Sequence, residues 1–104
     1  MGMFDMLGKL NEVKRAMEEI KARLETISVE GEAGEGNVKI IMNANRVVKS
    51  VSIADRLMVP ERKEELEELL ELAMNRAGEK AQNVSETEMK AAGQGLLPNI
   101  PGLF

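Results

Sequence analysis

The chain has 104 residues, which suffices for one small domain with a modest core. Hydrophobic residues make up 43% and charged residues 31% of the sequence, as in folded, helix-rich proteins, and the net charge is −4. Cysteine and histidine do not occur in it, which excludes disulfides, thiolate nucleophiles, the usual zinc sites and an imidazole general base.

The remaining residues point away from an enzyme and from a membrane protein. The acidic residues lie in helical surface runs, without the spacing of a two-carboxylate active site or a calcium loop. We therefore expect no catalysis, no cofactor, no metal ion and no small-molecule substrate. The apolar runs are shorter than the ~18 residues that span a membrane. The N-terminus lacks the pattern of a secretory signal, so we expect a cytoplasmic protein without a membrane partner.

A long amphipathic helix is predicted over about residues 5–25. The apolar residues that alternate there at spacings of three and four are Met3, Met6, Leu10, Val13, Met17, Ile20, Leu24 and Ile27. This period places them on one helical stripe, which we expect to pack within a dimer, on the sheet and on a second helix. At ~1.5 Å per residue the helix is about 30 Å long.

Three short strands follow, because the apolar period changes to two after Thr26. In chain order we predict a strand near 27–30, a turn at 31–36 (GEAGEG), a strand at 38–42 (VKIIM), a turn at 43–46 (NANR) and a strand at 47–53 (VVKSVSI). In the last strand Val47, Val51 and Ile53 share a face, and Lys49 breaks the pattern. Short strands joined by tight turns predict an antiparallel meander.

A second long helix is predicted from about Pro60 to about Ala92, with Pro60 in its first turn. Its apolar line consists of Leu66, Leu69, Leu70, Ala73, Met74, Ala77, Ala81 and Val84. The side chains of this line become smaller along the helix, from leucine to alanine. The surface on which the helix packs must therefore come closer toward its C-terminal end. We expect residues 1–92 to form the single domain. Residues 93–104 contain glycines, prolines and apolar residues, and we expect a flexible tail there.

The order of elements predicts an α+β domain, α-β-β-β-α. Its helices, about 30 Å long, exceed strands of about 20 Å, and a lone three-stranded sheet leaves two open edges. Pairing two copies removes both defects, so we expect a homodimer with protruding helices.

Basic residues crowd the flanks of the first helix's stripe, and two interpretations are open. The cations can pair, within one chain or between two subunits, with the glutamate-rich segment 61–71 of the second helix, or they can face the phosphates of a nucleic acid. The charge pattern alone favours the first interpretation. The net charge of −4 also counts against a nucleic-acid binder.

Nearly the whole chain resembles the YbaB/EbfC family of bacterial nucleoid-associated DNA-binding proteins. The resemblance is carried by the Met-rich start before the amphipathic helix, by VEGEAGEGNVKIIMN (29–43), by VSIADRLM (51–58) leading to KEELEELLELAMNRAGEKAQ (63–82), and by the ending GLLPNIPGLF. It implies the α-β-β-β-α fold and a tight homodimer whose helices protrude like tweezers. It also implies binding of duplex DNA with at most loose sequence preference, in association with the nucleoid and with effects on its organisation and on gene expression.

The residues expected to contact DNA follow from the charge pattern. They are Lys9, Lys14, Arg15, Lys21 and Arg23 on the first helix, assisted by Arg76, Lys80 and Lys90 on the second. Such contacts release counterions from the phosphates, so binding should be salt-sensitive. The only aromatic residues are Phe4 and Phe104, which argues against a platform that stacks unpaired bases.

The alternative function is a homodimeric protein–protein adaptor. Its protruding helices and apolar C-terminal tail would hold another protein. The tail residues that would dock are Leu96, Leu97, Ile100, Leu103 and Phe104.

Overall fold

The computed structural model describes the backbone of residues 3–96 and the side chains of residues 7–93. Its elements are α1 (Met3–Glu25), β1 (Ser28–Ala33), β2 (Val38–Asn43), β3 (Val48–Ile53), two 3-10 turns (Asp55–Leu57 and Pro60–Arg62) and α2 (Lys63–Leu96). The strands form an antiparallel sheet in the order β1-β2-β3. The predicted α+β fold, a helix, a three-stranded sheet and a long helix, is confirmed.

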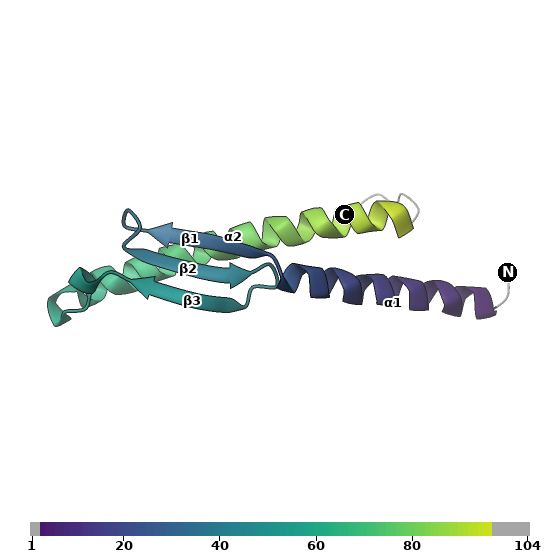
Figure 1. Ribbon diagram of the computed structural model, residues 1–104, viewed down its shortest axis with the longest axis horizontal. Helices are drawn as coiled ribbons and strands as arrows, with labels where there is room; N and C mark the ends of the chain where they lie inside the picture. The colour runs from purple at the N-terminus through teal and green to yellow at the C-terminus, as the bar shows by residue number, and fades with distance from the viewer. Residues whose placement is uncertain (1–2, 97–104) are drawn as a thin grey trace.

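The two helices extend past the sheet at the same end of the molecule (Figure 1). α2 packs on β1 and β2 and then continues beyond them. α1 lies outside the sheet, and a short turn connects its C-terminal end to β1. The molecule measures 68 × 23 × 17 Å. Its radius of gyration is 19.3 Å, against about 13 Å for a compact domain of this length. The described chain is therefore elongated, with two helical arms.

The core lies where α2 meets β1 and β2. Val38 and Ile40 of β2 are fully buried there, against Ala73, Ala77 and Ala81 of α2. The alanines bring the helix so close that no side chain fits on the facing residue of β1, Gly31. A Cβ at Gly31 would overlap the carbonyl oxygen of Ala73 and the amide nitrogen of Ala77. The close approach predicted from the narrowing apolar line is thus confirmed.

β1 is longer than the sequence predicted, because three residues assigned to the turn, 31–33, belong to the strand. Gly31 and Ala33 pair with Ile40 and Val38. The turn starts only at Gly34, and residues 34–36 all have positive φ. A glycine is needed at position 31 because α2 approaches the strand there. The assignment of Gly31 to the turn was therefore wrong.

The irregular residue in the third strand marks a change of register. Ile41 pairs with Ser50 and Met42 with Val48, so Lys49 has no partner on β2. This is the geometry of a β-bulge, in which one extra residue bends the strand. In the sequence, Lys49 interrupts the apolar face formed by Val47, Val51 and Ile53, at the position of this bulge.

Two further expectations need correction. α2 ends at Leu96, four residues beyond the predicted end, and its buried Gly93 lies within the helix. Residues 97–104 of the expected tail lie outside the described residues. The expected packing of the α1 stripe on the sheet does not occur within one chain, because α1 extends away from the sheet. Its packing within a dimer stays a prediction. Leu24 is buried, but Leu10 is 62% exposed and Met17 44%.

Candidate nucleic-acid interface

The basic residues of α1 lie on an arm that solvent reaches from most sides. The side chains of Lys9, Lys14, Arg15 and Lys21 are all exposed. At ~100° per residue, Lys14 and Lys21 share one flank of the apolar stripe, and Arg15 lies opposite the stripe. Within residues 7–93, no salt bridge joins any of these four to a carboxylate. These cations of α1 are therefore available to an anionic partner.

The glutamates of residues 61–71 do not pair with α1 in the same chain. They lie at the start of α2, at the opposite end of the molecule from the α1 arm (Figure 1). The interpretation that they neutralise the cations of α1 within one chain is therefore wrong. At that end Arg62 and Arg56 contact Glu65 instead, at 2.9 and 3.3 Å. The hydrogen bond from Arg62, with Arg56 acting in the same direction, lowers the pKa of Glu65 below its ordinary 4.5.

Arg23 has a different environment from the other cations of α1. Its Nε lies 2.9 Å from the Glu88 carboxylate of α2, and its side chain stays 68% exposed. This ion pair joins the two arms near their base. An exposed pair of this kind contributes about 0.2–1 kcal/mol. Arg23 thus links α1 to α2 and keeps most of its side chain exposed to solvent.

The three candidate cations of α2 lie in two places. Lys90 is exposed on the projecting part of the helix. Arg76 and Lys80 lie beside the sheet, where Arg76 Nη1 donates to the carbonyl oxygen of Glu32 at 2.7 Å and Lys80 Nζ donates to that of Glu30 at 2.8 Å. The fold therefore separates these two from the cations on the arms.

The turn between β2 and β3 anchors the base of the arms. The buried Asn43 accepts hydrogen bonds at Oδ1 from the backbone amides of Asn45 (2.9 Å) and Val47 (3.1 Å). Asn45 Nδ2 in turn donates to the carbonyl oxygen of Lys21 at 2.9 Å. The end of α1 is thus held to the sheet by this turn.

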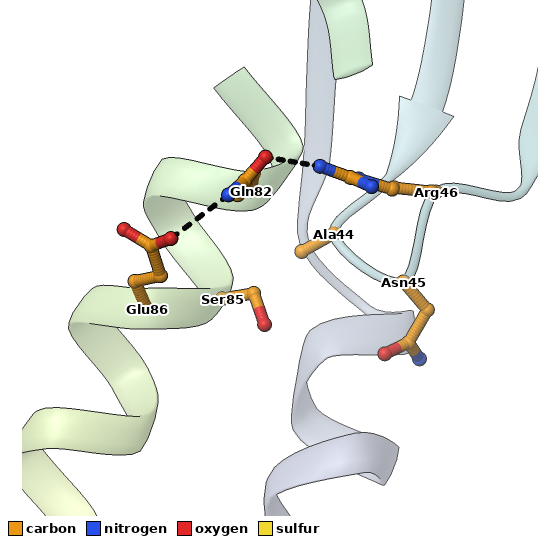
Figure 2. Close-up of a pocket in the computed structure, with 6 residues that line it drawn as sticks. All are labelled: Ala44, Asn45, Arg46, Gln82, Ser85 and Glu86. Carbon is orange, nitrogen blue, oxygen red and sulfur yellow. Dashed lines mark hydrogen bonds between the residues drawn. The ribbon is translucent and has the colours of Figure 1, made fainter. Parts of the chain in front are cut away.

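Arg46 is a cation at this base that the sequence did not single out. It lies in the turn with a φ of +66° and donates a hydrogen bond to Gln82 of α2, which donates to Glu86 at 3.0 Å. Figure 2 shows these residues around a pocket between the turn and α2, lined by Ala44, Asn45, Arg46, Gln82, Ser85 and Glu86. Only the fold brings Arg46 beside the arms, so no pattern in the sequence signalled it.

The described residues contain neither a cluster that could hold a metal ion nor a membrane-spanning helix. In the part of the chain that the structure covers, no group of three acidic residues is placed to hold a metal ion. No helix there is long and apolar enough to cross a bilayer.

The fold and this surface define a small α+β protein that presents cations on projecting helical arms. Residues 1–96 match the YbaB/EbfC DNA-binding family. The chain belongs to this family, as its resemblance in the sequence indicated. The family is defined by DNA binding and not by a catalysed reaction, in agreement with the expectation that the chain is not an enzyme.

Relatives from distant bacteria share nearly the full length. A nucleoid-associated protein of Flavobacterium johnsoniae is 41% identical over 103 residues, covering 99% of this chain and 95% of the relative. Another, from Dictyoglomus thermophilum, is 38% identical over 101 residues, covering 97% and 96%. Among solved structures, an uncharacterized protein from Helicobacter pylori matches with a TM-score of 0.73 at 20% identity, covering 94% of this chain and 99% of that one. At this identity the last likeness concerns the fold alone.

Proposed function

We propose that this chain is a nucleoid-associated protein that binds duplex DNA as a homodimer, mainly through backbone phosphates and with little sequence preference. The observation that carries the proposal is a set of four exposed cations on the α1 arm that form no salt bridge within residues 7–93, in a chain from a DNA-binding family. They are Lys9, Lys14, Arg15 and Lys21. The relatives' common name, nucleoid-associated protein, supports the same site of action.

Phosphate contacts suit these cations better than base contacts do. Lysine and arginine at the surface neutralise phosphates, which fix a protein on the duplex without reading its sequence. The net charge of −4 means that the attraction must come from a local cluster and not from the whole molecule. The proposed contacts come from Lys9, Lys14, Arg15, Lys21 and Arg23, with Lys90 on the second arm. Arg76 and Lys80 assist only where DNA reaches the side of the sheet.

The uncovered side of the sheet supports the homodimer. α2 covers β1 and β2, and the residues of β3 on the same face remain open: Val51, which pairs with Ile40, is 48% exposed. The exposed apolar residues on and around this side are Val48 (39%), Val51 (48%), Met58 (62%), Val59 (42%) and Met74 (46%). Several exposed apolar residues beside a strand with an open edge are typical of a protein–protein interface. We call these five residues the β3 surface and propose that a second copy covers it.

A titration of three unrelated duplexes at several salt concentrations tests the DNA-binding proposal. We expect similar affinities for the three sequences and a steep, shared loss of affinity with rising salt, because counterion release dominates. A strong preference for one duplex, or an affinity independent of salt, would contradict phosphate-based binding. Absence of binding to all three at low salt would contradict DNA binding itself.

The adaptor function has one supporting observation of its own. The stripe of α1 presents Leu7, Leu10 and Met17 to solvent at 52%, 62% and 44% exposure. Where the arms diverge, Met17, Ile20, Leu24 and Met89 contribute to a groove between α1 and α2. An apolar helix of a protein partner would fit such a groove. Failure of the chain to bind any duplex at low salt would place this function first.

A further inference from the structure

The two edges of the sheet differ in what covers them. β1 and β3 are both outer strands, since the order is β1-β2-β3. Along β1, side chains of α2 hydrogen-bond to the outward carbonyl oxygens of Glu30 and Glu32. Within residues 7–93, no side chain donates such a bond to a carbonyl oxygen of β3. The edge of β1 is therefore covered by hydrogen bonds that the edge of β3 lacks.

The rise along α2 and the rise along β1 match, which explains how Arg76 and Lys80 each reach a carbonyl oxygen at the strand edge. Arg76 and Lys80 are four residues apart on α2, a rise of about 6.0 Å. Their acceptors, Glu32 and Glu30, are two residues apart on β1, a rise of about 6.6 Å. The near match lets consecutive turns of α2 reach alternate residues of the strand, which are those whose backbone groups face outward.

The close approach at Gly31 holds this register. Gly31 lies between the two acceptors and contacts the backbone of α2 at Ala73 and Ala77. Arg76 precedes Ala77 by one residue, and Lys80 precedes the buried Ala81 by one. The cations therefore leave α2 on the flank next to its buried face, toward the strand edge.

We propose that Arg76 and Lys80, here called the edge cations, close β1 against the addition of another strand. An incoming strand needs the outward carbonyls of alternate residues, and two of those on β1 already have donors. Pairing between sheets is then confined to β3. For the proposed homodimer, on which this consequence rests, a chain with one open edge forms a closed pair, whereas two open edges permit continued growth.

The test compares the double variant Arg76→Ala/Lys80→Ala with the matched control Lys63→Ala/Lys90→Ala. Each removes two positive charges from α2, and alanine favours the helix. Sedimentation velocity is followed from low to high micromolar concentration, with circular dichroism to verify folding. We expect the double variant to shift to at least twice the wild-type mass, and the control to keep the wild-type mass. A folded double variant with the wild-type mass at every concentration would overturn the proposal.

The exchange variant Arg76→Lys/Lys80→Arg keeps a donor at both positions. It should retain the wild-type mass, and growth into larger species would contradict the role of the donors. If the double alanine variant does not fold, Arg76→Ala and Lys80→Ala are measured singly. Unchanged mass in both would overturn the proposal. A monomeric wild type would contradict the proposed homodimer, while the shift between wild type and variant would still test the edge cations.

A cysteine cross-link locates the new contact. The chain has no cysteine, so Glu30→Cys or Glu32→Cys introduces a single thiol beside the edge. Two β1 strands paired with each other place such thiols within disulfide distance in a suitable register. We expect disulfide-linked chains with at least one of the two cysteines in the double alanine background, and none in the wild-type background. Equal cross-linking in both backgrounds would contradict closure of the edge.

Discussion

Gly31 of β1 lies directly against Ala77 of α2. A Cβ added to Gly31 would lie 2.8 Å from the Cβ of Ala77, a distance that real side chains essentially never show, and would overlap the helix backbone. This contact fixes the distance between α2 and the sheet. The same residues set the direction in which Arg76 and Lys80 leave the helix.

Replacing Gly31 with alanine should therefore destabilise the fold. We expect a loss of about 2–3 kcal/mol in the free energy of unfolding, because α2 must move from the sheet. Gly78→Ala is the matched control, since its added Cβ would meet no heavy atom within 4 Å apart from its chain neighbours and the nearby backbone of its own helix. That change should stabilise α2 by about 0.5–1 kcal/mol. Urea unfolding of both variants measures the difference, and equal effects would contradict the close packing at Gly31.

The fold was predictable from the sequence where the signal lay within one element. The narrowing from Leu66 to Ala81 predicted the close approach of α2, and the misfit of Lys49 coincided with the bulge in β3. Gly31 was assigned to the turn because glycine in a Gly-rich stretch suits a turn as well as a close contact. Only the position of α2 decides between them.

The candidate site was less predictable, because it depends on pairs distant in the chain. The cations of α1 were proposed from their positions on the helix. Their separation from the glutamates of residues 61–71 of the same chain follows from where α2 begins in space. The contacts of Arg76 and Lys80 span 44 and 50 residues of sequence, and helical periodicity carries no information about such a partner. Arg46 contacts Gln82, 36 residues away in the sequence, and helical periodicity carries no information about this contact either.

The β3 surface gives a prediction for the homodimer. Val51→Glu places a charge on the apolar side of β3, whereas Ser52→Glu places it on the other side, opposite Lys39. We expect Val51→Glu to reduce the sedimenting mass from twice the 11.5 kDa chain to a single chain, and Ser52→Glu to leave the dimer intact. If both variants remain dimers, the apolar side of β3 does not belong to the interface.

Glu65 gives a prediction for the acid dependence of stability. Because Arg62, and then Arg56, lower its pKa in the folded chain, its carboxylate stabilises the fold above the ordinary value of 4.5. This contribution is lost as the pH falls through the lowered pKa. Wild type should exceed Glu65→Gln in unfolding midpoint near pH 7, and the difference should vanish at a pH below 4.5. A difference that grows on acidification would contradict the assignment.

The role of α1 in holding DNA is decided by the salt dependence of binding after its cations are removed. Lys9, Lys14, Arg15 and Lys21 are replaced together by glutamine, and the matched control replaces Lys39, Arg56, Arg62 and Lys63, which lie away from the arms. We expect weaker binding to every duplex for the α1 variant only. Its slope of log affinity against log salt should flatten by about 0.9 for each phosphate that the protein no longer neutralises. A folded α1 variant with the affinity and salt slope of the control would contradict DNA binding through this helix.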